Sequence, residues 1–494
     1  MNKVENIIKN KRLTFEQMVV ALAREAENNI DVLNISEKTE ELRKSGVICD
    51  LFEGNAPYRP RYIIPNYEKF MAEGSKFLGL KKPKDIWEAV NNLLIFYKHV
   101  PSITTMPVYI GNIDTLLDPF IKSEREARKA IEFFLIHIDR TITDSFCHGN
   151  LGPRATRAGR IILEIERELE NTIPNLTLKY NEDTEKVFAV EAIRTSLKTA
   201  KPSFANDEMF KKDFNGDYAI ASCYNGLPIG GGAYTLVRMN LKKLAESAQG
   251  KDDFFHNKLP EAMEAMGSYI NERIRYLIEE TAFFHSNFLV KEGFIEKEKF
   301  TAMFGIVGLA EAVDCIMEKE GKVGSFGHDV EFDDLGEEII KELHNFVLNY
   351  ESPHCKITEG RLLMHAQVGI SDDNGVSPGC RIQIGNEPEI WNHLRQAGRF
   401  HKYFPSGIGD IFPFEENTIN NPEYILNIIE GAFKVGIRYF SLYSSTADVI
   451  RITGYLVKKS EMEKLKKGEA VMQDTVALGL EATQNCNILN RKIR

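Results

Sequence analysis

The stretch VIRITGYLVKK (residues 449–459) combines the strand-forming residues Val, Ile, Thr, Tyr and Leu with a central glycine, Gly454. Glycine is unfavourable inside a strand, because it loses more conformational entropy than other residues and packs no side chain. A glycine in this setting marks a bulge, a turn or a place where another group approaches the backbone closely. The third possibility connects this stretch to function.

The charge of the chain favours small, soluble substrates. Its 494 residues include 62 Lys and Arg and 72 Asp and Glu, which gives a net charge of −10. The basic residues are scattered among acidic ones and do not gather on one segment, so the sequence argues against nucleic acid as a partner.

Membrane, export and disulfide signals are absent from the sequence. No apolar run reaches the length of a membrane span, and MNKVENIIKNKRLTFEQ lacks the apolar core of a signal peptide, so a cytoplasmic location without membrane contact is expected. The seven cysteines are widely spaced and form no CxxC pair. They predict neither a disulfide framework nor a zinc ribbon.

Apolar spacing divides the chain into regions. Residues 1–105 read as mostly helical, as in LTFEQMVVALAREAENNI. From residue 106 to 440, short apolar runs alternate with long helical segments, which is typical of an α/β architecture. Residues 441–494 hold Gly454, followed by a charged helix and tail.

Common catalytic signatures are missing: there is no GxxxxGK[ST], GxGxxG, HExxH or GxSxG. The loop GLPIGGGAY (226–234) offers backbone N–H groups that could hold an anion, but adjacent glycines are more often a tight turn.

RITGY (451–455) resembles the radical-bearing signature near the C-terminus of glycyl radical enzymes. Further segments, in the same order, resemble the anaerobic (class III) ribonucleotide reductases of that superfamily. They are NTIPNLTLKY (171–180), ASCYNGLPI (221–229), LVRMNLKKLA (236–245), MFGIVGLAEAVD (303–314), ESPHCKITEGRLL (351–363) and KYFPSGIGDIFPF (402–414). The likeness spans roughly residues 140–460.

Two departures separate the chain from those reductases. It shows no N-terminal ATP-binding regulatory domain, and residues 381–485 lack the four cysteines of the reductases' zinc site. On this pattern the chain is identified as a member of the YjjI family of compact glycyl radical proteins. The resemblance implies a ten-stranded β/α barrel with a helical N-terminal region, no bound metal and a homodimer.

The resemblance also implies a radical that is stored on Gly454 and passed to Cys223, whose thiyl radical abstracts hydrogen from a small polar metabolite. The α-carbon of glycine suits this role because it carries no side chain that hinders a partner atom. Arg451 and Tyr455 are expected to support the radical loop. The chain lacks a CxxxCxxC cluster motif, so a separate radical S-adenosylmethionine activase with an iron–sulfur cluster is the expected partner.

Several other residues are candidates for the substrate site, because they are cysteines beside a histidine or loop acids that could orient a hydroxyl: Cys147, His148, Cys355, Glu359, Asp410 and Glu415. The simpler interpretations are coincidental pairing for the cysteines and solvated loop residues for the acids.

Two alternative functions stay open. The first is a compact anaerobic ribonucleotide reductase, and the second is a non-catalytic barrel that binds a metabolite. Within the main interpretation, reductase, dehydratase and lyase chemistry are all compatible with the sequence, because specificity depends on the shape of the pocket.

Overall fold

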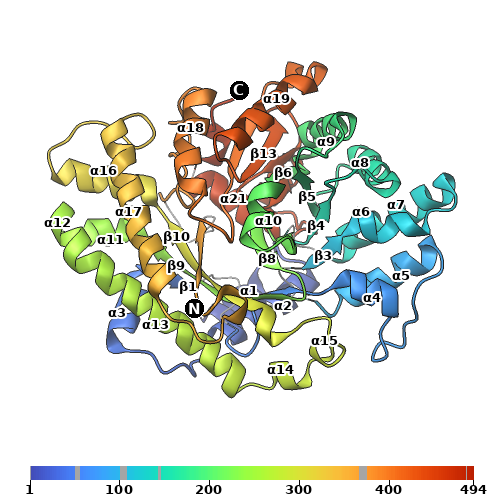
Figure 1. Ribbon diagram of the computed structural model, residues 1–494, viewed down its shortest axis with the longest axis horizontal. Coiled ribbons are helices and arrows are strands. Elements are labelled where there is room, and N and C mark those ends of the chain that lie inside the picture. Colours follow the sequence, from blue (N-terminus) through green and yellow to red (C-terminus); the bar gives the residue numbers. More distant parts are fainter. Residues whose placement is uncertain (1, 51–55, 101–107, 143–145, 367–374, 486) are drawn as a thin grey trace.

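Two β-sheets form the interior of the molecule and helices cover them (Figure 1). The computed structural model describes residues 2–50, 56–100, 108–142, 146–366, 375–485 and 487–494. The six-stranded sheet has the order β12-β13-β6-β5-β4-β3. Its strands are β3 (Tyr109–Asn112), β4 (His148–Leu151), β5 (Asn175–Tyr180), β6 (Ser203–Asn206), β12 (Asp410–Phe414) and β13 (Tyr439–Ser444).

Parallel pairing dominates this sheet. Strands β3 to β6 are parallel to one another, and β12 is parallel to β13, while β13 and β6 pair antiparallel. Parallel strands need long return connections, and the chain supplies them as helices on the outside of the sheet. The α/β class expected from the alternating pattern is confirmed.

The five-stranded sheet is built around β9. Strands β9 (Gly231–Asn240), β10 (Phe300–Val307) and β11 (Leu363–Ala366) are parallel. Two short strands, β1 (Ile48–Asp50) and β2 (Tyr62–Ile64), pair antiparallel with β9. Apolar periodicity did not predict β1 and β2, because three residues are too few to show an alternating pattern.

Two antiparallel hairpins extend from these sheets and carry the residues of interest. The first joins β7 (Tyr218–Ala221) to β8 (Asn225–Pro228), and the second joins β14 (Val449–Arg451) to β15 (Leu456–Lys458). Their tips contain Cys223 and Gly454, respectively.

The helices follow the amphipathic pattern expected from the sequence. In α8 (Arg157–Leu169), for example, Thr156 caps the first turn, and Ile161, Ile162 and Ile165 are buried. The other helices up to β9 are α1 (Lys3–Lys9), α2 (Phe15–Asn28), α3 (Glu37–Ser45), α4 (Tyr67–Glu73), α5 (Ile86–Tyr97), α6 (Ile113–Leu117), α7 (Glu124–Thr141), α9 (Lys186–Thr199) and α10 (Asp207–Asp213). Those after β9 are α11 (Leu241–Ser247), α12 (Lys251–Asp253), α13 (Leu259–Glu279), α14 (Phe283–Ser286), α15 (Phe288–Lys291), α16 (Leu309–Lys319), α17 (Val330–Asn349), α18 (Ile390–His401), α19 (Pro422–Lys434), α20 (Lys459–Lys466) and α21 (Thr475–Asn485).

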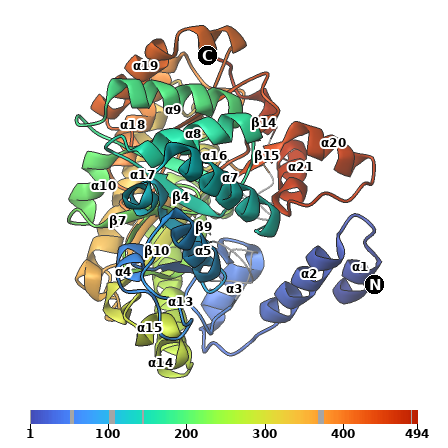
Figure 2. The ribbon, with the colours of Figure 1, turned by 90° about the vertical axis from the view of Figure 1, so that its right-hand side faces the viewer.

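A second apolar cluster, separate from the main core, forms around the C-terminal segment. Residues of β14, β15, α20 and α21 pack together there, including Val449, Leu456, Met462 and Val476. Figure 2 shows α20 and α21 at the edge of the barrel, with α1 and α2 beside them. Phe146, Ala200 and Ile411 of the main body belong to the same cluster, so it packs the segment against the rest of the protein.

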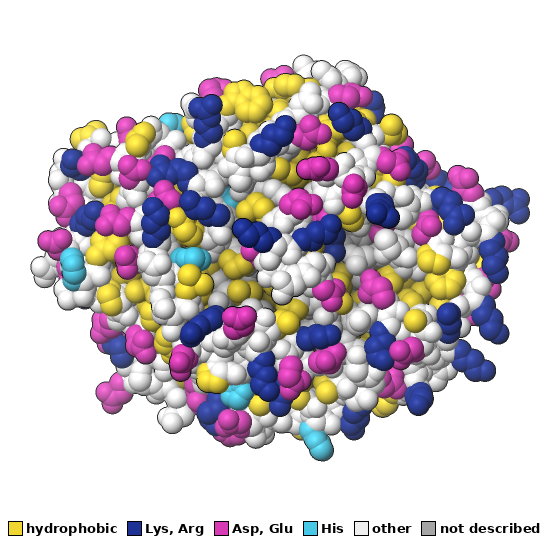
Figure 3. Space-filling model, viewed as in Figure 1, with side chains coloured by type: hydrophobic (Ala, Val, Ile, Leu, Met, Phe, Trp, Pro, Cys, Tyr) yellow, Lys and Arg dark blue, Asp and Glu magenta, His cyan; other side chains and the backbone are white. Residues whose placement is uncertain are grey.

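The surface carries both charge signs. On the face seen in Figure 3, Lys and Arg side chains are interspersed with Asp and Glu. Among the helices that the structure describes, none is both long and apolar enough to cross a bilayer.

Candidate active site

The tips of the two hairpins meet inside the barrel. A Cβ built on Gly454 would lie 1.9 Å from Cβ of Cys223 and 2.9 Å from its Sγ. Residues 231 positions apart are therefore in direct contact. The side chain of Cys223 is 5% exposed, so the contact is shielded from bulk solvent.

Close packing explains why residue 454 is a glycine. Its backbone does not have the positive φ that favours glycine. Any other residue would place its Cβ inside the van der Waals volume of Cys223. One of the two α-hydrogens of Gly454 occupies that direction and points at Cys223. Of the three possibilities that the sequence left open, the structure supports close approach of another group.

The carbonyl oxygen of Gly454 is held by two side chains. Asn175 Nδ2 donates a hydrogen bond to it at 3.0 Å, and Arg451 Nη1 lies 3.4 Å away. Arg451 Nη2 also donates to Oδ1 of Asn175 (3.0 Å) and to the carbonyl of Ala200 (2.8 Å). Arg451 is 1% exposed, and burial lowers its pKa to about 10, so the guanidinium keeps its charge at neutral pH.

The rest of the hairpin is anchored from two sides. Arg491 donates hydrogen bonds to the carbonyls of Arg451 (2.8 Å) and Ile452. The buried ring of Tyr455 packs against Phe146, with ring centroids 5.2 Å apart. The structure thus places Arg451 and Tyr455 around the loop that carries Gly454.

A chain of hydrogen bonds fixes the Cys223 loop. Burial lowers the pKa of His148 to about 3, so its ring is neutral at physiological pH. Because a carbonyl only accepts, Nδ1 of His148 donates to the carbonyl of Ser222 (2.8 Å). Nε2 must then accept from Thr177 (2.7 Å), whose hydroxyl in turn accepts from Tyr439 (2.7 Å).

These hydrogen bonds stabilise an unfavourable backbone conformation at Ser222. Ser222 has φ 61°, in the left-handed region that costs energy for a residue with a side chain. The turn it forms directs Cys223 toward Gly454, and the thiol donates to Oδ1 of Asn225 at 3.0 Å. Asn175 Nδ2 lies 3.4 Å from the Ser222 carbonyl as well as 3.0 Å from that of Gly454, so one side chain holds both hairpin tips.

The residues that hold both hairpins share a pattern along two strands. On β4, His148 and Asn150 are two residues apart and therefore lie on the same face of the strand. Asn175, Thr177 and Lys179 are spaced in the same way on β5, and all five side chains face the interior. Sequence reasoning did not select Asn175 or Thr177. The available signal was the run NLTLKY, in which every second residue of a fully buried strand is polar.

Asp410 belongs to a second buried polar group. Arg494 donates to Nδ1 of His393 (2.8 Å), so Nε2 of that ring carries the proton and donates to Oδ2 of Asp410 (2.7 Å). Arg381 Nε lies 3.9 Å from the other carboxylate oxygen. Burial opposes ionisation of Asp410, but His393 and Arg381 outweigh it and lower the pKa of the carboxyl.

The remaining candidates are not gathered at Cys223. Cys147 is buried near Tyr67 and Tyr97, both of which belong to helices of the N-terminal region. The carboxylates of Glu359 and Glu415 are exposed.

Cys355 lies at the opposite end of β10 and β11 from the Cys223 loop. It is adjacent to residue 302, near the start of β10, whereas Tyr224, which follows Cys223, donates to the carbonyl of Ala366 at the end of β11. Burial raises the pKa of the Cys355 thiol to about 11. This thiol is therefore protonated at neutral pH.

Metal ligands are not clustered in the part of the chain that the structure describes: no group of three or more His, Cys, Asp and Glu residues there could hold an ion.

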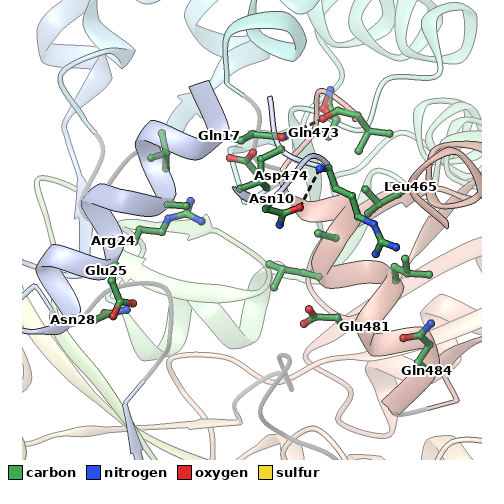
Figure 4. Close-up of a pocket in the computed structure, with 18 residues that line it drawn as sticks. Asn10, Gln17, Arg24, Glu25, Asn28, Leu465, Gln473, Asp474, Glu481 and Gln484 are labelled. Carbon is green, nitrogen blue, oxygen red and sulfur yellow. Dashed lines mark hydrogen bonds between the residues drawn. The ribbon is translucent and has the colours of Figure 1, made fainter. Parts of the chain in front are cut away.

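A groove of about 550 Å³ separates α2 from α21, at the edge of the C-terminal segment (Figure 4). Asn10, Gln17 and Arg24 line one side of it, and Asp474 and Glu481 line the other. Gln17 reaches across this groove: its side-chain amide donates hydrogen bonds to the carbonyls of residues 471 (2.9 Å) and 472 (3.1 Å). The N-terminal helices are thereby fastened to the segment that carries Gly454.

Comparison with solved structures identifies the class of fold. The structure matches the B12-independent glycerol dehydratase of Clostridium butyricum (TM-score 0.68, 12% identity, 97% of this chain and 84% of that chain). It also matches the hydroxyproline dehydratase of Clostridioides difficile (0.68, 12%, 99% and 88%) and the anaerobic ribonucleotide reductase of Thermotoga maritima (0.65, 12%, 91% and 91%). The fold is the ten-stranded β/α barrel of glycyl radical enzymes, as the resemblance implied.

Sequence comparison narrows this class to one family. The model of the glycyl radical enzyme YjjI-like family matches residues 13–494. A protein of Haemophilus influenzae is 42% identical over 100% of this chain and 98% of its own length, and protein YjjI of Escherichia coli is 40% identical over 100% and 96%. The chain belongs to the YjjI-like family of glycyl radical enzymes, which confirms the assignment made from its motifs.

Proposed function

We propose that the protein stores a radical on the α-carbon of Gly454 and uses Cys223 to pass it to a small polar metabolite. The observation that carries this proposal is the contact between the two residues, in which a Cβ on Gly454 would lie 2.9 Å from Sγ of Cys223. The built Cβ takes the direction of one α-hydrogen, so the contact puts that hydrogen beside the Cys223 side chain, as a direct transfer between the two residues requires.

The transfer is a hydrogen-atom exchange. The S–H bond of Cys223 breaks and a C–H bond forms at Gly454, which leaves a thiyl radical on sulfur. The thiyl radical then takes a hydrogen atom from the substrate, re-forming the S–H bond and leaving a carbon radical on the substrate. Asn175 and Arg451 support the exchange by fixing the Gly454 carbonyl, so that its α-hydrogen keeps its place against the side chain of Cys223.

Formation of the radical requires access to a buried glycine. A separate radical S-adenosylmethionine activase would remove the first hydrogen atom, and Gly454 must leave the barrel to reach it. Residues of β14, β15, α20 and α21 pack on one another, so this segment can move as a unit once its contacts with Phe146, Ala200 and Ile411 break. Its restraints include the hydrogen bonds that Gln17 donates to the carbonyls of residues 471 and 472 and that Asn175 donates to the carbonyl of Gly454.

The location of Cys355 disfavours nucleotide reduction through a Cys223–Cys355 pair. The two residues lie at opposite ends of β10 and β11, so Cys355 is poorly placed to act beside Cys223. We therefore favour a radical enzyme acting on a small metabolite.

Electron paramagnetic resonance tests this function. The anaerobic protein, treated with reductant, S-adenosylmethionine and its activase, should give a doublet from the single remaining α-hydrogen of Gly454. Exposure to air should then cleave the chain at residue 454. A protein that stays silent while its activase cleaves S-adenosylmethionine would refute the proposal and favour a non-catalytic binding barrel.

A further inference from the structure

Two buried polar groups beside Tyr224 have unused hydrogen-bonding capacity. Arg381 is 8% exposed, and its Nε donates to the carbonyl of Gly409 at 2.7 Å. Its two Nη groups make no hydrogen bond within the residues that the structure describes. The guanidinium carbon lies 5.9 Å from the centre of the Tyr224 ring.

The second group is an imidazole nitrogen. His365 is fully buried, and its Nδ1 donates to the carbonyl of Ser406 at 3.1 Å. Its Nε2 is therefore an acceptor, and it has no partner in the described part of the chain. Burial lowers the pKa of this ring to about 3, so the ring stays neutral. Its centroid lies 5.8 Å from that of Tyr224.

We propose that Arg381 and His365 form the recognition site for a small hydroxycarboxylate substrate, with the carboxylate on Arg381 and a hydroxyl donated to His365. A buried acceptor without a partner is costly, so a ligand hydroxyl that donates to Nε2 of His365 gains affinity, and the unused Nη groups of Arg381 can bind a carboxylate. Both groups lie against the ring of Tyr224, the residue that follows Cys223 in the chain.

The charges at the site favour a carboxylate over a phosphate. The planar edge of an arginine matches a carboxylate with two parallel hydrogen bonds. Only one such edge is unused here, and Asp410 lies 3.9 Å from the same guanidinium. A dianionic phosphate ester would be repelled by that carboxylate more strongly than a monoanion is.

The proposal deepens the proposed function and rests on it, yet its test requires no radical. Binding to the unactivated protein is measured by calorimetry for matched pairs: glycerate against glycerol, and lactate against propane-1,2-diol. The carboxylate of each pair should bind at least about tenfold more tightly, since hydrogen bonds to a charged group contribute about 1.5–3 kcal/mol, or roughly 10- to 100-fold in affinity.

Variants assign the two contacts. Arg381→Lys keeps the charge but loses the planar edge, and it should weaken lactate binding about 10-fold or more. The control is Arg395→Lys, at an exposed side chain of α18, which should leave lactate binding unchanged. His365→Leu should remove the preference for lactate over propionate. Melting curves without ligand establish that each variant is folded. The comparison of acids with diols is made on the unaltered protein and does not depend on any variant.

Three results would overturn the proposal: equal binding of acids and diols, no binding of any carboxylate, or tighter binding of glycerol phosphate than of glycerate. Each can occur while the glycyl doublet is present, so failure of this proposal is distinguishable from failure of the radical function.

Discussion

Replacing Gly454 by alanine tests the packing argument directly. The added Cβ would lie 1.9 Å from Cβ of Cys223, whereas carbon atoms in contact are about 3.5–4.0 Å apart, so one hairpin must move by about 2 Å. Overpacking of this kind costs about 1–3 kcal/mol, and the upper end is expected because the obstructing Cβ is attached to the backbone and cannot rotate away. Urea titration should report this loss in the apparent free energy of unfolding.

A double-mutant cycle separates the clash from other effects. Cys223→Gly removes the obstructing Cβ, so the Gly454→Ala penalty should fall by about 1–3 kcal/mol in that background. Gly431→Ala on α19 is the matched control: its new Cβ would meet the Trp391 ring at 3.8 Å, an ordinary contact, and the change should be neutral or stabilising by up to about 1 kcal/mol. If the effects of Gly454→Ala and Cys223→Gly on the unfolding free energy are additive, the two residues are not in contact and the packing argument is wrong.

The other predictions concern the supports of the hairpins. Asn175→Leu should cost about 1–3 kcal/mol, because it leaves buried partners unsatisfied, and it should change the hyperfine coupling of the glycyl doublet; an unchanged spectrum would contradict its contact with Gly454. Arg491→Ala should speed protease cleavage within residues 449–458, while Lys492→Ala, whose side chain is partly exposed, should not; equal rates would argue against the anchor. Gln17→Ala should speed activation by the activase, and an unchanged rate of doublet formation would show that α2 does not restrain the segment.

Acid should destabilise the protein partly through His365. Its pKa is about 3 in the fold and about 6.5 when unfolded, so the unfolded chain gains a proton first as pH falls. Its contribution is fully present above about pH 6.5 and is lost at up to about 1.4 kcal/mol per pH unit down to about pH 3. Unfolding free energies of His365→Gln should therefore depend less steeply on pH, and parallel curves would contradict the burial of this ring.

The sequence indicated the two residues at the hairpin tips, but not the side chains that hold the hairpins in place. RITGY and ASCY led to Gly454 and Cys223 through their resemblance to glycyl radical enzymes, and the structure brings these two residues into contact. Asn175, Thr177 and Tyr439 act through contacts between distant segments, which no local pattern reports. The alternating polarity of NLTLKY indicates a polar interior face, but it does not say which partners that face meets.

The loop acids show a further limit of sequence reasoning. Asp410 and Glu415 were both expected in loops, but Asp410 is the first residue of β12 and is buried against His393, whereas Glu415 follows that strand and is exposed. Burial of Asp410 depends on Arg494 and His393, which arrive from other parts of the chain. Arg381 was not selected from the sequence, because an isolated arginine carries no motif.

Deuterium exchange of the glycyl radical tests the central claim most directly. If Gly454 and Cys223 exchange hydrogen reversibly, the thiol deuteron acquired from heavy water is delivered to the α-carbon, and the doublet of the activated protein should collapse to a singlet. In Cys223→Ala, which keeps the packed Cβ but has no thiol, the doublet should form and persist in heavy water. Collapse at the same rate in both proteins would show that the radical does not pass through Cys223 and would contradict the proposed mechanism.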